Sequence, residues 1–522
     1  LQQAAIHGSR ACRGDETGAQ QVDLQQKVPC GIALLDPARL VVQRARKVKR
    51  REVGGGVESR LGRAERPRIG GDRHGRLRRQ LLGVGLLVKV EVEGAIAVEF
   101  DGGHGKDRVR ALGLPRGDLL ERGVDDAWEE APAMYLIMPD RFANGDPSND
   151  DVKGQLERGI DRTEMYARHG GDLAGVESKL DYLEELGVGA VWMTPVVAND
   201  LAKTSYHGYA CTDSYKVDPR LGTLEDYKSL AAAAHDRGIR IVHDWVPNHW
   251  GNLHRLLTHP VDSAWVHNWK GGFTDDKRTN YRSGVVLDPH GQSPDVAGFN
   301  DGWFDRMMPD MNQANEDLQR YMGTNILWWM AEVGIDGLRI DTYTYGQQDA
   351  MAAMTKRVSA SFQGCFMFAE AWVYGSAKQA ALVEGNGFGW GPTTGLDGAV
   401  DFAWHFAMQE AMEQGEGWEH GIGKVYEVLV EDFLYPDPQK LVTFLDNHDT
   451  HRWIAEAGDA DKAKAGLAML LMGRGTPCLY YGTELGFDTR CEPDGKVRQD
   501  FPGGWPEDDR NAFSAEGRTP QE

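Results

Sequence analysis

The sequence has 522 residues and a formal net charge of −21 at pH 7, with 58 basic and 79 acidic side chains. This acidic balance argues against a nucleic-acid partner, because binding to a phosphate backbone relies on clustered Lys and Arg. No apolar run reaches the ~20 residues of a membrane-spanning helix. The six cysteines are scattered and form no CxxC pair, so neither a zinc site nor a disulfide framework is predicted.

The first 127 residues differ in composition from the rest of the sequence. They contain no Trp, no Tyr and a single Phe, Phe100, and they carry 24 Lys and Arg against 17 Asp and Glu. A chain with so few large apolar side chains offsets its ordering entropy poorly. Only residues 83–99 alternate as a strand does, so the segment is expected to be irregular or weakly β.

Three interpretations of residues 1–127 stay open at this stage. The segment is a basic tail that binds an anionic partner, a degenerate all-β accessory domain, or a stretch that is not the natural product of the gene, such as a mistranslated upstream frame. We draw no function from this segment.

From Met134 onward, short apolar segments alternate with stretches of helical length, such as residues 176–186 and 224–237. This alternation predicts parallel βαβ units, and eight of them fit an α/β fold of the (β/α)8 TIM-barrel type. The eight predicted strands are residues 134–142, 188–196, 240–248, 337–343, 365–372, 399–406, 441–448 and 476–484.

Two features of residues 128–522 modify this barrel. The stretch 249–312 is too long for an ordinary loop and predicts a small subdomain inserted after the third strand. The sequence ends 38 residues after the eighth predicted strand, which leaves little room for a final helix and none for a C-terminal β-domain. A truncated barrel end is therefore expected, and an unstable chain is one alternative.

Most of the predicted strands end in acids, amides or imidazoles. In a barrel these ends share one rim, the C-terminal face at which active sites lie. Cleavage of a glycosidic bond by a retaining mechanism needs two carboxyl groups ~5–5.5 Å apart. Acids from different strand ends meet that demand when the barrel brings them together.

Four motifs and one auxiliary motif occur in a fixed order along the chain. They are residues 244–249 (DWVPNH), 308–312 (MPDMN), 337–341 (GLRID), 368–372 (FAEAW) and 444–449 (FLDNHD). Together they give the sequence over roughly residues 128–522 a resemblance to the α-amylase family of glycoside hydrolases. One departure is Ala369, at a position where the family usually has Gly.

The resemblance implies a role for each of three acids. Asp341 matches the nucleophile and Glu370 the general acid and base. Asp449 matches the stabilising acid, in preference to Asp446, because the motif ends in His-Asp. Arg339 lies two residues before Asp341 and hence on the same face of the strand, where its charge is expected to keep Asp341 ionised.

Further positions match sugar-binding residues of the family. Tyr209, in residues 206–209 (YHGY), matches the residue that stacks on the sugar at the cleavage site, with His207 beside it. His249 and His448 match donors to sugar hydroxyls. The substrate-binding residues implied are His207, Tyr209, Asp244, His249, Arg339 and His448.

Residues 144–150 (NGDPSND) and 170–172 (GGD) are rich in oxygen-bearing side chains. From composition alone an ordinary turn is favoured, because Asn, Asp, Gly and Pro are turn residues. However, residues 140–150 resemble the calcium loop of the neopullulanase and cyclomaltodextrinase branch. The resemblance implies a structural calcium ion, with six to eight oxygen ligands. The ligands implied are Asn144, Asp146, Asn149, Asp150, the Gly170 carbonyl and Asp172.

Residues 435–449 (YPDPQKLVTFLDNHD) and 498–505 (RQDFPGGW) resemble the cyclomaltodextrinase/neopullulanase-like enzymes of Gram-negative bacteria. That resemblance implies hydrolysis, with retention, of α-1,4-glucosidic bonds in α-glucans such as maltodextrins, cyclodextrins or pullulan. Transglycosylation, or sucrose or trehalose isomerisation, on the same barrel is the alternative, as is a non-catalytic binding subunit. Periplasm and cytoplasm both stay open, as does the oligomeric state.

Overall fold

The computed structural model describes residues 86–91, 95–100, 128, 133–387, 393–413, 415, 417 and 420–519. They belong to two compact units, Gln3–Gly123 and Val124–Glu522. In the first unit, β1 (Leu86–Glu91) pairs with β2 (Ala95–Phe100), so the single strand predicted over residues 83–99 is two antiparallel strands. Apart from these strands, the interpretations of residues 1–127 concern a segment outside the described residues.

Eight parallel strands form one sheet in the second unit. They are β3 (Met134–Ile137), β4 (Ala190–Met193), β7 (Arg240–Trp245), β8 (Gly337–Ile340), β9 (Phe366–Ala369), β10 (Gly398–Ala399), β11 (Val442–Phe444) and β12 (Thr476–Tyr480). Their spatial order is β10-β9-β8-β7-β4-β3-β12-β11, and a backbone bridge between Val400 and Val442 connects the two end strands. The sheet is therefore a nearly closed barrel, and the predicted (β/α)8 fold is confirmed.

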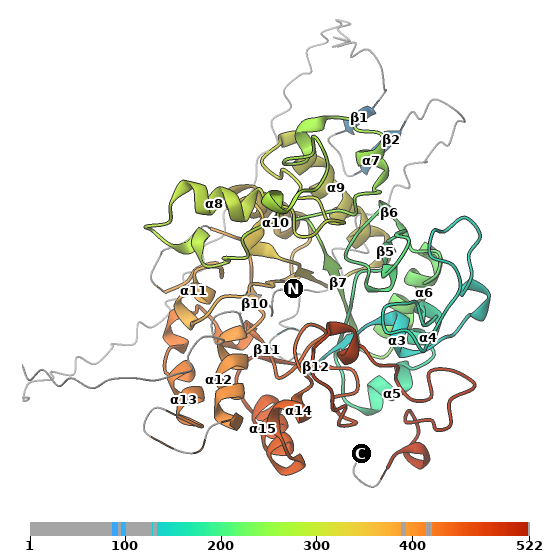
Figure 1. Cartoon of the computed structure of the whole chain (residues 1–522), viewed down its shortest axis with the longest axis vertical. Coiled ribbons are helices and arrows are strands. Elements are labelled where there is room, and N and C mark those ends of the chain that lie inside the picture. Colours follow the sequence, from blue (N-terminus) through green and yellow to red (C-terminus); the bar gives the residue numbers. More distant parts are fainter. Residues whose placement is uncertain are drawn as a thin grey trace, which may run out of the picture. The chain divides into compact units, whose positions relative to one another are not determined.

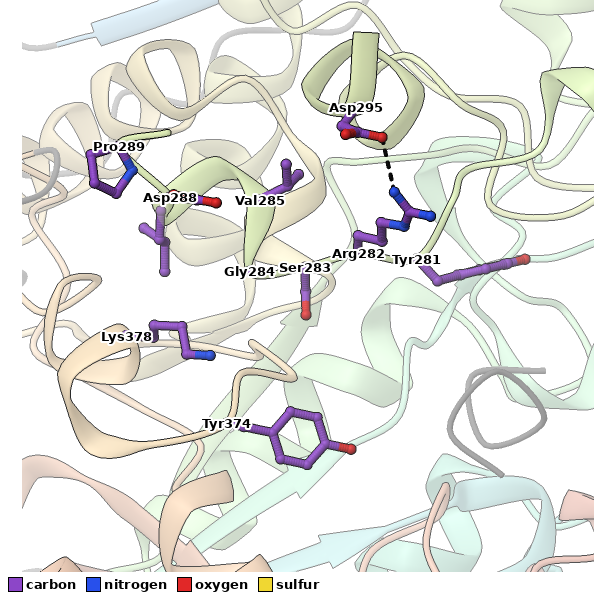
Figure 2. A pocket seen from close by; sticks show the side chains of 11 residues that line it. Tyr281, Arg282, Ser283, Gly284, Val285, Asp288, Pro289, Asp295, Tyr374 and Lys378 are labelled. Atoms are coloured by element: carbon purple, nitrogen blue, oxygen red, sulfur yellow. Dashed lines mark hydrogen bonds and ion pairs between the residues drawn. The ribbon is translucent and has the colours of Figure 1, made fainter. Parts of the chain in front are cut away.

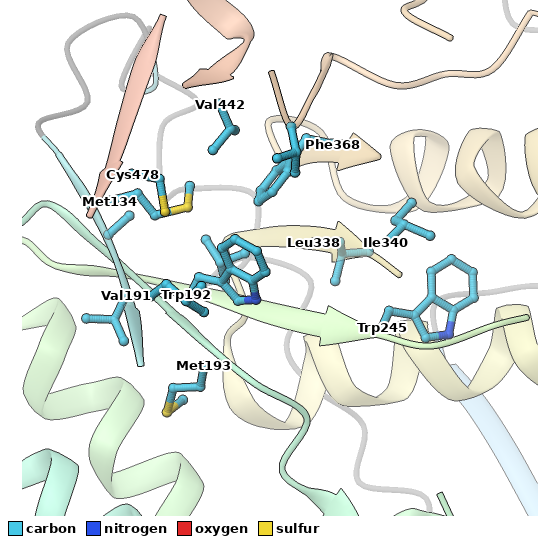
Figure 3. Packing of buried hydrophobic residues seen from close by; sticks show 14 of the residues in the cluster. Met134, Val191, Trp192, Met193, Trp245, Leu338, Ile340, Phe368, Val442 and Cys478 are labelled. Carbon is cyan, nitrogen blue, oxygen red and sulfur yellow. The ribbon is translucent and has the colours of Figure 1, made fainter. Parts of the chain in front are cut away.

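Most strand residues are apolar on both faces, because one face fills the barrel and the other packs against helices. All four residues of β3 (MYLI) are fully buried. Figure 3 shows side chains from several strands packed in this core, among them Trp192, Phe368, Val442 and Cys478. Barrels of this kind are filled by side chains and leave no channel, so the chemistry is confined to the rim.

Two of the predicted strands are too long because a helix begins inside each of them. Residues 134–142 include α3 (Pro139–Phe142), which starts at a proline whose fixed φ suits the first helical turn. Most of 399–406 lies in α12 (Phe402–Glu413). The Asp401 carboxylate accepts a hydrogen bond from the Trp404 amide at 3.0 Å, and this cap starts the helix.

Helices lie between the strands and surround the barrel (Figure 1). The helix predicted over residues 224–237 is confirmed as α6 (Leu224–His235), which begins at a capping box of Thr223 and Asp226. The helix predicted over 176–186 is two short helices, α4 and α5. The other helices have these bounds: α4 (Leu173–Glu177), α5 (Leu180–Glu185), α7 (Arg255–Thr258), α8 (Ser293–Asn300), α9 (Glu316–Val333), α10 (Gln348–Ser361), α11 (Ser376–Ala380), α13 (Gly423–Leu429), α14 (Trp453–Ala457) and α15 (Ala460–Met472).

Two departures from a plain barrel occur on its rim. A small antiparallel pair, β5 (Val197–Ala198) and β6 (Asp213–Val217), follows β4. The predicted subdomain lies between β7 and α9, contains α7 and α8, and is closed by a backbone bridge between His249 and Asp310. It buries several aromatic side chains, of which Trp250 and Trp265 contact each other and belong to the main hydrophobic core.

The segment after β12 packs back onto the barrel. As far as the structure describes it, to residue 519, it holds two 3-10 helices, η9 (Asp494–Val497) and η10 (Ala515–Gly517), and no α-helix or β-domain. Phe501 is fully buried, and its ring lies 5.2 Å from that of Phe142. The segment is thus anchored to the barrel by a buried aromatic contact. Within the described residues no helix is long and apolar enough to cross a membrane.

Candidate active site

Parallel strands bring three of the predicted residues to one rim. Asp244 lies near the end of β7, while Asp341 and Glu370 directly follow β8 and β9. Because β7, β8 and β9 are neighbours in register, the three carboxylates lie side by side. All three are buried, with Glu370 the most exposed at 6%.

The guanidinium group of Arg339 connects these three acids. Its Nη1 donates to Asp244 Oδ1 at 2.7 Å and to Asp341 Oδ1 at 2.5 Å, and its Nη2 lies 3.3 Å from Glu370 Oε1. The side chain is 1% exposed, so these interactions act with little screening by water. One buried cation thus holds three carboxylates close to one another.

Thr342 and Trp372 fix the orientation of the two catalytic candidates. The Thr342 hydroxyl donates to Asp341 Oδ2 at 2.9 Å, and its backbone amide donates to Glu370 Oε2 at 2.7 Å. Trp372 Nε1 donates to Glu370 Oε1 at 2.8 Å. Thr342 has φ +44°, a left-handed conformation that a β-branched residue rarely adopts. Such strain is typical of functional sites, and here it aims the amide and the hydroxyl at two different acids.

Burial changes the proton affinity of Glu370 and of Asp341. It raises the pKa of Glu370 to about 7, with Arg339 opposing the rise and the Asp341 charge adding to it. Burial also raises the pKa of Asp341 to about 6, because desolvation outweighs the opposing charge of Arg339. Arg339 thus lowers the pKa of Asp341 against the effect of burial, and its expected role of keeping Asp341 ionised stays a prediction. Near neutral pH Asp341 is still mostly ionised while Glu370 retains a large protonated fraction, as an acid and nucleophile pair requires.

Asp449 comes from another part of the rim, five residues after β11. Its Oδ1 lies 2.8 Å from Arg498 Nη2 and its Oδ2 lies 3.4 Å from His448 Nε2. Burial opposes ionisation, but His448 and Arg498 together lower the pKa of Asp449 below its usual value. Asp449 therefore carries a negative charge under conditions in which Glu370 is protonated.

Tyr209 links the two halves of the site. Its hydroxyl donates to Asp244 Oδ2 at 2.9 Å and lies 2.8 Å from His448 Nε2. The rings of Tyr209 and His448 are stacked, with centroids 5.5 Å apart, and the His207 ring stacks on Tyr209 at 5.9 Å. Burial lowers the pKa of His207 to about 3 and that of His448 to about 4, so both imidazoles are neutral donors at neutral pH.

His249 lies next to this cluster on the inserted subdomain. Its ring stacks on Phe304 at 5.0 Å, and Nδ1 lies 3.3 Å from the Asn248 side-chain amide. Burial lowers its pKa to about 3. The His249 side chain is buried, at 1% exposure.

A model of the family described as "Alpha amylase, catalytic domain" matches residues 136–512, which is more than two thirds of the chain. The chain belongs to the α-amylase family. Its relatives in this family include the beta/alpha-amylase of Paenibacillus polymyxa, 30% identical over 71% of this chain, and neopullulanase 2 of Thermoactinomyces vulgaris, 30% identical over 70%. The chain spans 29% and 58% of the lengths of these two relatives.

Solved structures of the same family agree with the fold. An Anoxybacillus α-amylase is 31% identical, with a TM-score of 0.59, and the match covers 72% of this chain and 75% of that one. The resemblance to the α-amylase family that the motifs carry is therefore confirmed, as is the barrel on which this family's site is placed.

Arg498 is a residue of this α-amylase-family site to which the sequence argument assigns no role. Besides Asp449, it reaches the His448 carbonyl with Nε at 3.0 Å, the Tyr206 hydroxyl with Nη1 at 2.9 Å, and Asp494 Oδ2 with Nη2 at 3.0 Å. It begins the stretch 498–505 that supports the branch resemblance. Its position at the start of this stretch is the sequence signal that could have identified Arg498 as a site residue.

Asp446, the other acid of the fourth motif, has a different environment from Asp449. Both of its oxygens accept from the Thr483 hydroxyl, at 2.8 and 2.9 Å, and Oδ2 also accepts from the Trp453 amide at 2.9 Å. These bonds tie the end of β11 to the start of α14 and to the segment after β12. Asp446 thus lies in a structural network, whereas Asp449 faces Arg498 and His448.

The predicted calcium loop is a compact cluster. Asp150 Oδ1 accepts from Asn144 Nδ2 at 2.9 Å, and Asp172 Oδ2 accepts from Asn149 Nδ2 at 3.0 Å. The side-chain oxygens of Asn144 and Asn149 are buried and have no partner among the described residues. Gly170 has φ +90°, and a Cβ there would lie 2.5 Å from Asp150 Oδ1.

The carboxylates of this loop are partly used by the loop itself. Asp172 accepts from the amides of Gly145, Asp146 and Gly175, and Asp146 accepts from the Ser148 amide. Burial raises the pKa of Asp150 to about 6. Across the described residues there is no cluster of three or more His, Cys, Asp or Glu side chains arranged for a metal. A cation here therefore depends on amide and backbone oxygens as well as on carboxylates.

Proposed function

We propose that the protein is a retaining glycoside hydrolase that cleaves α-1,4-glucosidic bonds of maltodextrins, cyclodextrins or pullulan. The observation that carries the proposal is the contact of Asp341 and Glu370 with one guanidinium group, at 2.5 and 3.3 Å. Carboxyl groups that share one small cation are close enough for the retaining reaction, which inverts the anomeric carbon twice. The amylase and neopullulanase names of the relatives support an α-glucan as substrate.

The reaction then has two steps. Asp341 attacks the anomeric carbon while the bond to the leaving oxygen breaks and Glu370 gives that oxygen its proton. The glycosyl ester on Asp341 is next attacked by water, which gives a proton to Glu370 and releases the sugar with its original anomeric configuration. The raised pKa of Glu370 suits both directions of proton transfer.

Asp449 and its neighbours support the positively charged transition state. The Asp449 carboxylate, held by Arg498, supplies a fixed negative charge and accepts from sugar hydroxyls. Tyr209 offers an aromatic face to the ring that is attacked, and the neutral His207 and His448 donate to its hydroxyls. These groups are in place before substrate arrives, so little reorganisation is needed.

A digest of maltoheptaose, β-cyclodextrin, pullulan and sucrose tests the proposal. We expect products from the α-glucans, and ¹H NMR of the first products to show the α-anomer. Products from sucrose alone, or a β-anomer, would contradict it. Longer oligosaccharides than the substrate would indicate transfer to sugar acceptors and favour the transglycosylase alternative.

Replacing the nucleophile is the sharpest test of the residue roles. Asp341→Asn removes the attacking oxygen charge while keeping the shape of the side chain, so we expect kcat to fall by about 10³-fold or more. Binding of maltoheptaose, measured by calorimetry, should change little. Undiminished turnover by a variant of confirmed mass would remove Asp341 from its proposed role.

We also propose that the loop binds a structural calcium ion through Asn144, Asp146, Asn149, Asp150, the Gly170 carbonyl and Asp172. The buried, unpartnered oxygens of Asn144 and Asn149 support this proposal, because a buried acceptor without a donor is costly and a hard cation satisfies it. Such an ion supplies rigidity to a loop that follows β3; no step of the reaction depends on it.

A further inference from the structure

His249 lies in a neck of chain segments that joins the inserted subdomain to the barrel. The auxiliary motif, residues 308–312, runs beside it. His249 and Asp310 form an antiparallel backbone bridge, and the Met311 amide donates to the Asn248 carbonyl at 2.9 Å. The position of His249 therefore depends on how firmly the stretch around Asp310 is held.

The Asp310 side chain is held by an ion pair from the other side of this neck. Its Oδ2 lies 2.7 Å from His267 Nδ1, and the His267 amide donates to the Asp310 carbonyl at 3.0 Å. The Asp310 side chain is 1% exposed and that of His267 is 21% exposed. An unpaired carboxylate is costly to bury, so the pair stabilises the neck only while one of its members holds a proton.

The groups around the pair favour keeping that proton. The His267 ring also faces Asp301, whose Oδ1 lies 3.8 Å from Nε2, while Trp303 and the neutral His249 bring no charge. Burial raises the pKa of Asp310 to about 8, with His267 opposing the rise. Burial opposes the charge of His267, but Asp310 and Asp301 raise its pKa above the usual value. The pair thus keeps one proton to a higher pH than an exposed imidazole does.

The subdomain is not packed against the barrel on every side. A pocket of about 670 Å³ separates its residues 281–289 from Tyr374 and Lys378 of the segment after β9. Figure 2 shows these two side chains facing Ser283 across the open space, and the Ser283 hydroxyl donates to the Trp372 carbonyl. Because this side leaves room for movement, the contacts of the neck are important for the position of the subdomain.

We propose that the His267–Asp310 pair is a proton-dependent latch, which holds the neck of the subdomain closed and thereby positions His249. The sugar-binding role of His249 rests on the function proposed above, whereas the latch itself does not. When the pair releases its single proton to water, Asp310 keeps a buried charge without a cation beside it. The neck then opens, because water stabilises the free carboxylate better than the closed neck does.

The expected pH window follows from the open and closed states of the neck. In the open state the two side chains titrate as exposed groups, and an imidazole loses its proton near about pH 6.5. In the closed state the proton is kept to about pH 8. The latch is therefore fully effective below the first value and is lost as the pH rises to the second. Each pH unit between them favours opening about tenfold, which gives about 30-fold over the window.

Hydrogen–deuterium exchange of the full chain tests the latch without relying on activity. The measured quantity is the protection of amides in residues 248–267 and 308–312 from about pH 4 to about pH 9, corrected for the intrinsic pH dependence of exchange. We expect wild-type protection in the neck to fall about 30-fold between about pH 6.5 and about pH 8. Protection in the barrel strands should stay constant over this window.

Two variants separate a proton-dependent latch from simple packing. Asp310→Asn keeps a hydrogen-bonding side chain without the charge, so its neck should show no fall in protection as the pH rises through the window. His267→Gln leaves only the carboxyl group to hold the proton, and an exposed carboxyl ionises near about pH 4. Its protection should therefore begin to fall at about pH 4 instead of about pH 6.5.

His235→Gln is the matched control. His235 pairs with Asp336 at the same distance of 2.7 Å, but the pair lies between α6 and the start of β8, outside the subdomain. This variant should keep the wild-type pH dependence in the neck. Wild-type protection that stays constant across the window overturns the latch, as does an equal loss in Asp310→Asn and His267→Gln at every pH.

The link to His249 is tested with maltoheptaose at about pH 6.5, where the wild-type latch is closed. We expect His267→Gln to raise KM about fivefold and to change kcat less than about twofold, because a side chain that binds the sugar is displaced. An unchanged KM in a variant with the predicted exchange overturns the positioning of His249. A wild-type protein that cleaves no α-glucan overturns the proposed function, whereas the exchange measurement still decides the latch.

Discussion

At the scale of single residues, the site is organised by two buried arginines. Arg339 forms ion pairs with Asp244, Asp341 and Glu370, and Arg498 forms one with Asp449. Each guanidinium offers donors in a fixed planar fork, which suits several carboxylate oxygens at once in a way that a lysine ammonium does not. The acids are consequently held close together despite their mutual repulsion, and their proton affinities differ.

The pH dependence of kcat/KM follows from those affinities. In the proposed reaction, turnover needs Asp341 ionised and Glu370 protonated, and burial raises their pKa values to about 6 and about 7. We expect a narrow bell, with activity lost below about pH 6 as Asp341 gains a proton and above about pH 7 as Glu370 loses its own. Initial rates on maltoheptaose from about pH 4 to about pH 9 check this, with melting temperatures across the same range as the control. A flat profile between pH 5 and pH 9 would contradict the assignment.

Arg498 is expected to act as a positioning residue for Asp449. Arg498→Met should lower kcat by about 10- to 100-fold, because Asp449 loses the group that sets its position and stabilises its charge. Added guanidinium ion should restore part of the rate, which it would not do for a general loss of packing. Arg490→Met, at a 61% exposed arginine, is the control and should change kcat less than about twofold. No rescue, with the fold intact, would leave Arg498 a purely structural role.

At the scale of elements, the predicted strand and helix positions are confirmed where the apolar pattern is long. The predicted bounds are wrong where a single residue ends one element and starts the next. The eight strands lie where apolar runs predict them, but Pro139 and Asp401 start helices inside two of these runs. A helix start depends on one local side chain, and the periodicity of apolar residues gives no information about it. For the same reason, the single helix predicted over residues 176–186 is two helices, α4 and α5, in the structure.

The calcium loop gives a prediction at this scale. We expect chelator to lower the melting temperature by about 5 °C, since an ion that binds only the folded state stabilises it. Gly170→Ala should abolish this difference, because the added methyl displaces Asp150, whose Oδ1 would lie 2.5 Å away. Gly159→Ala shares the positive φ but meets no atom within 4 Å, so it should keep the calcium response. A melting temperature insensitive to chelator would make the loop an ordinary turn.

At the scale of the whole molecule, the segment after β12 contributes to the core of the barrel. Phe501 is fully buried and contacts the rings of Phe142, Tyr182 and Phe513, at 5.2, 5.6 and 4.2 Å. These rings pack together as one buried aromatic cluster that joins the segment after β12 to the barrel.

Phe501→Ala measures how much this segment contributes to stability. We expect it to lower the free energy of unfolding by about 3–5 kcal/mol, the usual cost of removing a buried phenyl ring. Phe433→Ala, at a 75% exposed phenylalanine, should change it by less than about 0.5 kcal/mol. Urea unfolding of both variants gives the comparison. Equal midpoints would show that the segment after β12 is not part of the cooperative core.

The sequence by itself determined the family, the barrel and the identity of the catalytic candidates. Each motif at a strand end lies within a few consecutive residues, so it can be recognised from the sequence alone. Asp341 and Glu370 could therefore be named from residues 337–341 and 368–372 alone.

Only the tertiary structure decided how these residues act on one another. Arg498 reaches Asp449 across 49 residues of chain, and Ser283 reaches Trp372 across 89. The rise in the pKa of Asp341 despite the charge of Arg339 depends on burial, which many distant segments create together. Contacts and desolvation of this kind depend on all the segments that surround a residue in the folded protein. They therefore cannot be predicted from a short stretch of sequence.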